Sequence, residues 1–311
     1  TSLVWMLGTF FLFIFVSWDA IIIKPYELIS ASLVILWTVF LLSELKRGFN
    51  WRSGLIFGVT GAVLFLLFYF WFFLAAIGVA LFNLFEKRVS LKNYVSLISV
   101  AILTILLASP FWLPLAKSYS LYGAENWQLG FLVVSWLSTH APLLDFSLVG
   151  LLSFFGFCTL IFYRGRFYIR ALLSLFVASY VWQLMGLVTI LFFASPLQES
   201  KGFHFWDQAI LALAAAYGIG RLFDYFTQKY PTNKWQASLA IVGVLLLSTQ
   251  LLFGTFVDDS RVLAIRDRSS VPGREAGEIV EFLDNNYEDI YQMTILQSGI
   301  PELHAFLPIN D

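Results

Sequence analysis

The stretch GLIFGVTGAVLFLLFYFWFFLAAIGVALFNLF, residues 54–85, is an apolar run without a single charged residue. As one helix its 32 residues would be about 48 Å long, too long for the ~30 Å hydrocarbon core of a bilayer. Basic residues flank both ends: Lys46, Arg47 and Arg52 before the run, and Lys87, Arg88 and Lys92 after it. Because lysine and arginine mark the cytoplasmic side of membrane proteins, the run is predicted to cross twice, as a hairpin that turns near Tyr69–Trp71.

The rest of the chain repeats this pattern of apolar runs and basic loops. Further runs cover 1–17, 28–43, 95–109, 145–163, 171–195, 205–220 and 236–256, with a weaker one at 129–137. Two more basic loops follow, one with Arg164, Arg166 and Arg170, the other with Arg221, Lys229 and Lys234. The sequence therefore predicts a polytopic α-helical membrane bundle over residues 1–256. It has nine crossings, a cytoplasmic N-terminal end and an extracytoplasmic C-terminal segment.

The composition agrees with a chain that lies largely in lipid. Apolar residues make up 59% and charged residues 13% of the 311, and the mean hydropathy is +0.79. Soluble domains have ~45–50% apolar and ~25% charged residues. A formal net charge of −1 offers no general basic surface for nucleic acid, and the lone Cys158 cannot form an internal disulfide. We expect the chain to be an internal piece of a longer protein.

The unusual polar residues collect in three predicted outward loops, residues 18–27, 109–144 and 196–207. Lys201 and His204 lie three residues apart just before a helix start, where donors and the helix dipole hold a phosphate, and Lys117 adds a third donor. Aromatic faces, carboxylates and amides suit a sugar, and the candidates are Tyr122, Glu125, Asn126, Trp127 and Gln128. Residues 129–143 are interpreted as a re-entrant or interfacial helix above a cavity. This face is predicted to hold a lipid-linked sugar.

Several of these residues also fit simpler roles. Asp145 and Asp207 stand where helices are expected to start, so each is expected to cap free backbone N–H groups. Trp112, Trp127 and Trp206 fit an interfacial aromatic belt as well as a binding site. The three histidines lie in distant segments without metal-ligand spacing, so no metal site is predicted, and a divalent cation held by carboxylates stays open.

Residues 257–311 are richer in charge and contain no further spanning run. Ala276, Ile279, Val280 and Leu283 follow the i, i+3, i+4, i+7 spacing of an amphipathic helix, which residues 284–286 are expected to end. IYQMTILQ, residues 290–297, is predicted to be a short buried strand. A helix followed by a strand predicts the beginning of a small extracytoplasmic α/β domain that is cut off at Asp311.

Four motifs carry a resemblance to a known family. They are LFYFWFFLAAIG (67–78), ASPFWLPLAKSYSLYGAENWQ (108–128), LALAAAYGIGRL (211–222) and VPGREAGEIVEFLDNN (271–286). From about residue 54 to the end, the chain resembles C-type (GT-C) membrane glycosyltransferases, and more narrowly the arabinofuranosyltransferase A family of galactan 5-O-arabinofuranosyltransferases. The resemblance implies an inverting transfer of a pentofuranose such as arabinofuranose. The donor would be a polyprenyl-phosphate sugar and the acceptor an outward-facing glycan of the cell envelope, at the plasma membrane and without an evident cofactor.

The resemblance also implies a carboxylate base in the first outer loop after the first span of the enzyme. We expect that loop to lie before this piece, so the catalytic base is not identified, and Asp19 is only an outer-loop candidate. Two other interpretations stay open: a non-catalytic scaffold whose aromatic loops contact protein partners in a membrane assembly, and a transporter or flippase for lipid-linked sugars. The transporter fits less well, because the chain shows no obvious repeat and its charges lie near one surface.

Overall fold

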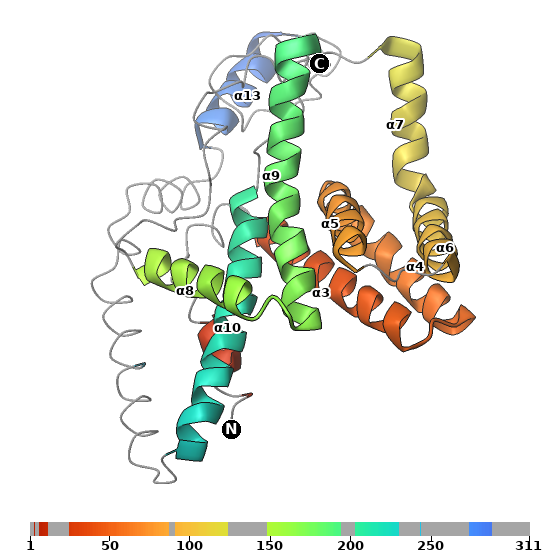
Figure 1. Cartoon of the computed structure of the whole chain (residues 1–311). Coiled ribbons are helices and arrows are strands. Elements are labelled where there is room, and N and C mark those ends of the chain that lie inside the picture. Colours follow the sequence, from red (N-terminus) through yellow and green to blue (C-terminus); the bar gives the residue numbers. More distant parts are fainter. Residues whose placement is uncertain are drawn as a thin grey trace. The chain divides into compact units, whose positions relative to one another are not determined.

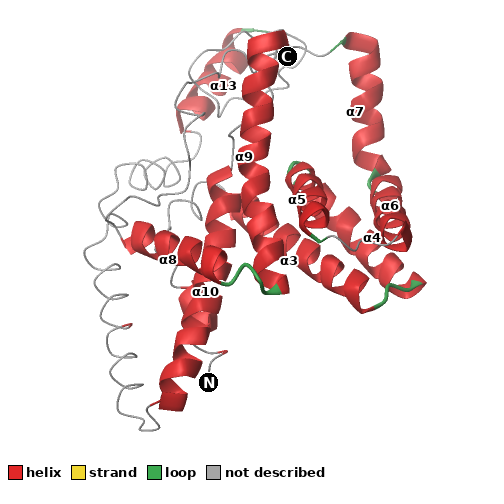
Figure 2. Ribbon diagram, viewed as in Figure 1, coloured by secondary structure: helices red, strands yellow, loops and turns green. Residues whose placement is uncertain are grey.

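The computed structural model describes residues 3, 6–11, 25–86, 91–123, 148–193, 203–229, 243 and 274–287 (Figure 1). The chain divides into two compact units, Thr1–Gly243 and Val244–Asp311, and each is described by itself. Regular structure in the described residues is helical (Figure 2). The first unit contains α3 (Pro25–Arg47), α4 (Trp51–Leu67), α5 (Trp71–Phe85), α6 (Leu91–Leu107), α7 (Ser109–Tyr122), α8 (Leu148–Phe162), α9 (Phe167–Phe193) and α10 (Phe203–Lys229).

Residues 54–85 form two helices, as the basic flanks predict. The chain breaks at residues 68–70, between α4 and α5, so the predicted break in this run is confirmed. Asn50 caps α4, because its side-chain oxygen accepts a hydrogen bond from the backbone N–H of Ser53 at 2.9 Å. α4 packs against α3 and α6, whereas α5 packs against α3 and α9. Both helices of the broken run are therefore built into the bundle, each with its own neighbours.

Contacts between helix ends bring three of the predicted basic loops together. Arg170 near the start of α9 forms an ion pair with Glu86, which directly follows α5. The ammonium group of Lys46, near the end of α3, lies 4.9 Å from the centre of the Phe167 ring. The ends of α3 and α5 and the start of α9 therefore meet, and we call this region, with Lys46, Glu86, Phe167 and Arg170, the basic end of the bundle.

Helices α8 and α10 approach each other closely through glycine. A Cβ atom at Gly156 of α8 would lie 2.4 Å from the carbonyl oxygen of Leu211, and one at Gly218 of α10 would lie 2.4 Å from Thr159 Oγ1. Small residues allow such close approach of helix backbones in membranes. The two contacts show that α8 and α10 pack closely against each other.

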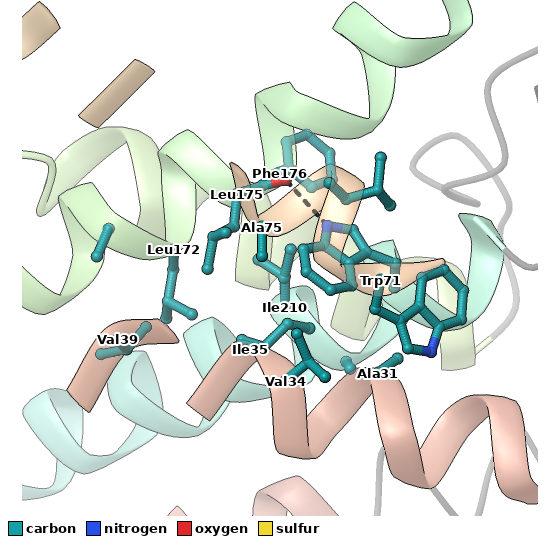
Figure 3. Packing of buried hydrophobic residues seen from close by; sticks show 14 of the residues in the cluster. Ala31, Val34, Ile35, Val39, Trp71, Ala75, Leu172, Leu175, Phe176 and Ile210 are labelled. Atoms are coloured by element: carbon teal, nitrogen blue, oxygen red, sulfur yellow. Dashed lines mark hydrogen bonds between the residues drawn. The ribbon is translucent and has the colours of Figure 1, made fainter. Parts of the chain in front are cut away.

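The core of the first unit lies between α3, α5, α9 and α10. Figure 3 shows Ala31 and Ile35 of α3 on the side that faces Trp71 of α5 and Ile210 of α10, with Leu175 of α9 nearby. All five side chains are fully buried. This core holds the starts of α3, α5 and α10 together, and these starts carry the polar residues described below.

The described helices give fewer candidate spans than the sequence predicts. With 23, 27 and 27 residues, α3, α9 and α10 are long and apolar enough to cross a membrane. Asn93–Leu107 and Ser109–Tyr122 pass the same test only as a pair, bent by 72°, while α4, α5 and α8 are shorter apolar helices. Within the described residues there are thus three candidate spans, or four with the bent pair. The multi-pass helical membrane fold is confirmed at this level, and the nine crossings are not.

In the second unit, α13 (Arg274–Asn286) confirms the amphipathic helix predicted from Ala276 to Leu283. It ends at Asn286, within the segment that was expected to end it. The predicted strand at 290–297 lies outside the described residues. The α/β domain and its boundary after residue 256 therefore stay predictions.

Candidate functional site

Two carboxylates are buried where α3 and α10 begin. Glu27, the third residue of α3, is 2% exposed, and Asp207, in the second turn of α10, is 1% exposed. The hydroxyl of Tyr26 donates a hydrogen bond to Glu27 Oε1 at 3.2 Å, and Ser179 Oγ of α9 donates to Asp207 Oδ1 at 2.7 Å. Ionisable side chains inside a membrane bundle are costly to bury, which makes their surroundings a candidate functional site.

Asp207 does not cap α10, so that expectation is wrong. The helix already includes Phe203, and Asp207 therefore lies one turn inside it, past the free N–H groups of the helix start. Its carboxylate instead bonds to Ser179, whose hydroxyl also lies 2.8 Å from the carbonyl oxygen of Phe176. Asp207 thus ties α10 to α9. The other predicted cap, Asp145, lies outside the described residues.

Further polar side chains are buried on α8 and α10. Ser153 of α8 is 1% exposed and Gln208 of α10 is 9% exposed. Ser153 lies three residues before Gly156, and Gln208 lies three residues before Leu211, the residue that Gly156 contacts. In the described part of the chain, Ser153 Oγ and Gln208 Nε2 make no hydrogen bond. We call Ser153, Ser179, Asp207 and Gln208 the polar layer. Buried polar atoms normally form hydrogen bonds, so these two atoms of the layer could still bond to a ligand.

Aromatic rings connect the α4–α5 turn to α3, α9 and α10 at this end. Trp71 stacks on Trp206 with ring centres 5.6 Å apart, and Phe70 stacks on Phe203 at 5.8 Å. Trp182 of α9 meets Phe70 edge-on at 5.5 Å, and Tyr26 lies 6.0 Å from Phe68. Such pairs stabilise by ~0.5–1.5 kcal/mol beyond the area that they bury. We call the seven residues the aromatic cluster: Tyr26, Phe68, Phe70, Trp71, Trp182, Phe203 and Trp206.

The two central indoles are also held by hydrogen bonds. Trp71 Nε1 donates to Ser30 Oγ at 2.9 Å, and Trp206 Nε1 donates to the carbonyl oxygen of Leu175 at 3.0 Å. Figure 3 draws the second bond as a dashed line at Leu175. Ser30 Oγ in turn donates to the carbonyl oxygen of Glu27 at 3.1 Å. One chain of contacts thus links the backbone at Glu27 to α5, α10 and α9.

Three of the predicted site residues lie in described helices, and all three are exposed. His204 stands in the first described turn of α10 between the buried Phe203 and Phe205. Lys117 and Tyr122 lie on α7, none of whose residues is buried. All three side chains are therefore accessible to a ligand. A phosphate site formed by Lys117 together with His204 stays a prediction. The other candidates lie outside the described residues: Asp19, Glu125, Asn126, Trp127, Gln128 and Lys201.

The polar stretch that begins at Ser109 starts as a helix, not as the loop that we expected. α7 contains Pro110 at its start and continues through Pro114. Proline suits the first turn of a helix, because its missing N–H would have no partner there. Trp112 Nε1 donates to the carbonyl oxygen of Ile105 at 2.8 Å and so bridges the bend between α6 and α7.

Sequence reasoning missed the polar layer. Ser153 and Ser179 stand inside apolar runs and carry no motif, and Asp207 was interpreted as a cap. The available signal was the pair Asp207 and Gln208 at the start of an otherwise apolar helix. The described helices contain no group of three His, Cys, Asp or Glu side chains placed to hold a metal ion.

A family model described as Arabinofuranosyltransferase N terminal matches residues 14–246, which is most of the chain. The chain belongs to the arabinofuranosyltransferase A family. This confirms the family resemblance and indicates an arabinofuranosyltransferase-type glycosyltransferase. The motifs at 67–78, 108–128 and 211–222 lie within the matched residues, and the motif at 271–286 lies beyond them. A search of curated proteins gave no match. The matched region contains every described helix from α3 to α10, together with both buried carboxylates and the aromatic cluster. Helix α13 lies beyond it.

Asp207→Ala is expected to lower the free energy of unfolding by about 2 kcal/mol, because it removes a buried hydrogen bond between α9 and α10. The matched control is Asp224→Ala on the same helix, where the side chain is 44% exposed, and it should change stability by less than about 0.5 kcal/mol. Unfolding of the detergent-purified protein, followed by tryptophan fluorescence, measures both. Equal losses in the two variants would show that Asp207 does not tie the helices.

Proposed function

We propose that this chain is the membrane part of a glycosyltransferase that moves arabinofuranose from a polyprenyl-phosphate donor to an extracytoplasmic glycan of the cell envelope. The observation that carries the proposal is the family match over residues 14–246. Within the matched region, buried carboxylates and aromatic rings gather where α3 and α10 begin, and the buried Gln208 Nε2, next to Asp207 in the chain, makes no hydrogen bond to the described residues. Such a combination suits a site for a polar substrate with a lipid anchor.

In this proposal the basic end faces the cytoplasm and the aromatic cluster faces outward, in a plasma membrane. The support is the clustering of Lys46 and Arg170 with Glu86 and Phe167, since lysine and arginine favour the cytoplasmic side. Trp71 of the aromatic cluster lies at the opposite end of α5 from Glu86. The C-terminal segment then follows on the outer side, and the loops that carry the predicted sugar contacts open outward.

An inverting transfer needs protein groups that bind the sugar, groups that stabilise the departing phosphate and a base that accepts a proton. The acceptor hydroxyl oxygen attacks the anomeric carbon, the bond from that carbon to the phosphate oxygen breaks, and a carboxylate takes the hydroxyl proton. Cationic donors stabilise the departing phosphate. We assign the phosphate to His204 together with Lys201 and Lys117. The sugar is assigned to Tyr122, Glu125, Asn126, Trp127 and Gln128, and the base to a carboxylate outside the described residues.

The structure supports His204 in this role through its surroundings. Its neighbours Phe203, Phe205 and Trp206 are buried, so the turn is anchored while the imidazole remains exposed. Backbone N–H groups in the first turn of a helix point away from the helix and favour an anion. Asp207, bonded to Ser179, fixes the next turn against α9.

His204→Ala is expected to reduce kcat/KM for arabinofuranosyl transfer about 10²-fold, the loss typical of removing one donor to a developing negative charge. The assay uses membranes that contain the full-length protein, polyprenyl-phosphoryl arabinofuranose as donor and a galactan oligosaccharide as acceptor. Arg221→Ala, a variant at an exposed cation on the same helix, is the matched control and should transfer normally.

Unchanged transfer by His204→Ala at normal expression would contradict the phosphate assignment. Absence of any transfer by the wild-type protein would contradict the proposed reaction itself. In that case, donor moved across vesicle membranes without transfer would indicate a flippase, and co-purification of stoichiometric partner subunits would indicate a scaffold.

A further inference from the structure

A groove runs between α3 and α4 and reaches Tyr168 of α9. Its volume is about 730 Å³. Trp37 Nε1 at its floor lies 3.2 Å from both the carbonyl oxygen of Phe57 and Thr60 Oγ1, so the two helices that form the walls are joined. Most of the lining is apolar and includes Leu33, Leu36, Phe40, Ile56, Val59 and Val63.

Polar residues gather at one end of this groove. Ser43, Glu44 and Arg47 belong to the last turns of α3, and Tyr168 belongs to the first turn of α9. This end coincides with the basic end of the bundle, because Lys46 and Phe167, the neighbours of Arg47 and Tyr168, contact each other there. The groove therefore combines an apolar body with a polar mouth.

The length of the groove corresponds to one leaflet of a bilayer. From Leu33 to Arg47 its α3 wall rises about 21 Å, at 1.5 Å per residue. Half of a bilayer, including its headgroup layer, is about 20–22 Å thick. A partner helix that crosses the membrane would need a surface of ~30 Å or more. A lipid from the leaflet at the basic end matches the groove in length.

Charges at the mouth favour an anionic headgroup. Arg47 is exposed at the mouth, and Lys46 lies beside it in the chain. The opposing charge is Glu44, one of whose carboxylate oxygens already accepts a hydrogen bond from Ser53 Oγ at 2.9 Å. A guanidinium group is well suited to bind a phosphate with two parallel hydrogen bonds. The hydroxyl of Tyr168, 3.4 Å from Ser43 Oγ, adds a neutral donor.

We propose that this groove binds one anionic glycerophospholipid from the leaflet at the basic end. An acyl chain lies between α3 and α4, and the headgroup phosphate lies on Arg47. The site is separate from the proposed transfer site, which lies at the opposite end of the bundle, and it does not depend on the identity of the transferred sugar. A lipid in this position fills the gap between α3 and α4 on the lipid-facing side of the bundle.

The test is native mass spectrometry of the delipidated full chain in detergent, titrated with phosphatidylglycerol or phosphatidylcholine. We expect the wild-type protein to bind phosphatidylglycerol at least tenfold more tightly than phosphatidylcholine. Arg47→Gln should weaken the binding of phosphatidylglycerol about tenfold, as expected for the loss of one charge-assisted hydrogen bond, and should leave the binding of phosphatidylcholine unchanged. Arg52→Gln, at a basic residue that does not line the groove, is the matched control and should change binding less than about twofold.

A second pair of variants tests the apolar body of the groove. Leu33→Trp places a larger side chain in the groove and should abolish the binding of both lipids, whereas Ile98→Trp, on the exposed surface of α6, should leave it intact. Thermal unfolding confirms that each variant is folded. Equal affinity for the two lipids, unchanged binding in Arg47→Gln or Leu33→Trp, or binding of polyprenyl phosphate in preference to phosphatidylglycerol would each overturn the proposal.

Discussion

Trp71→Ala should lower the free energy of unfolding by about 3–5 kcal/mol, as for other large aromatic residues removed from a packed core. The side chain is fully buried between α3, α9 and α10. Its removal ends the stacking on Trp206 and leaves Ser30 without its indole donor. Unfolding of the purified protein in mixed micelles with increasing denaturing detergent gives the free-energy difference.

The matched control for this variant is Trp51→Ala. Trp51 begins α4 and is 74% exposed, with the Arg52 guanidinium 5.6 Å from its ring. Because an exposed cation–π contact contributes only ~0.5–1 kcal/mol, this variant should cost no more than about 1 kcal/mol. Trp71→Phe, which keeps a ring but loses the N–H donor, should fall between the two. If Trp71→Ala cost no more than Trp51→Ala, the core would not depend on the aromatic cluster.

Gly156→Ala should destabilise the protein by about 2–3 kcal/mol, the range found for overpacked interiors. Its methyl group would lie 2.4 Å from the carbonyl oxygen of Leu211 and 3.1 Å from the carbonyl carbon. Both are backbone atoms, so no side-chain rotation relieves the contact and α8 must move away from α10. The same denaturing-detergent measurement gives the change in unfolding free energy.

The sign of the Gly156→Ala effect is diagnostic. Alanine is favoured over glycine inside a helix by about 1 kcal/mol, so without the contact to Leu211 this variant would be more stable than the wild type. Gly165→Ala is the matched control, because a Cβ at this turn position meets no atom within 4 Å, and little change is expected. A stabilised Gly156→Ala protein would show that α8 and α10 are not in close contact.

The break in the apolar run 54–85 could be predicted from its length and from the basic residues at both of its ends. The run 54–85 is too long to cross once, and Lys46, Arg52, Lys87 and Lys92 lie on both of its sides. Helix–helix partners could not be predicted in the same way. Nothing in the local sequence of Gly156 shows that it faces Leu211, because such contacts depend on which helices become neighbours.

The candidate site was predicted in part. His204 was expected just before a helix start, whereas it lies in the first described turn of α10, where its side chain is exposed. Asp207 was misread, since a carboxylate near a helix start most often caps it, and only the true start of α10 shows that this one lies a turn further in. Proline in the first turn and the interior of α7 had suggested an irregular segment where the chain is helical.

The short length of α4 has a consequence for the lipid around it. α4 has 17 residues and is about 26 Å long, several ångströms less than the ~30 Å apolar thickness of a bilayer. Its outer surface exposes Leu55, Val59 and Val63, so lipid chains contact it directly. If α4 crosses the bilayer, the lipid beside it must become thinner to match that surface, at a cost of a fraction of a kcal/mol per ångström of mismatch. A crossing α4 would thus surround itself with a patch of compressed membrane, and thin bilayers would accommodate it with less deformation than thick ones.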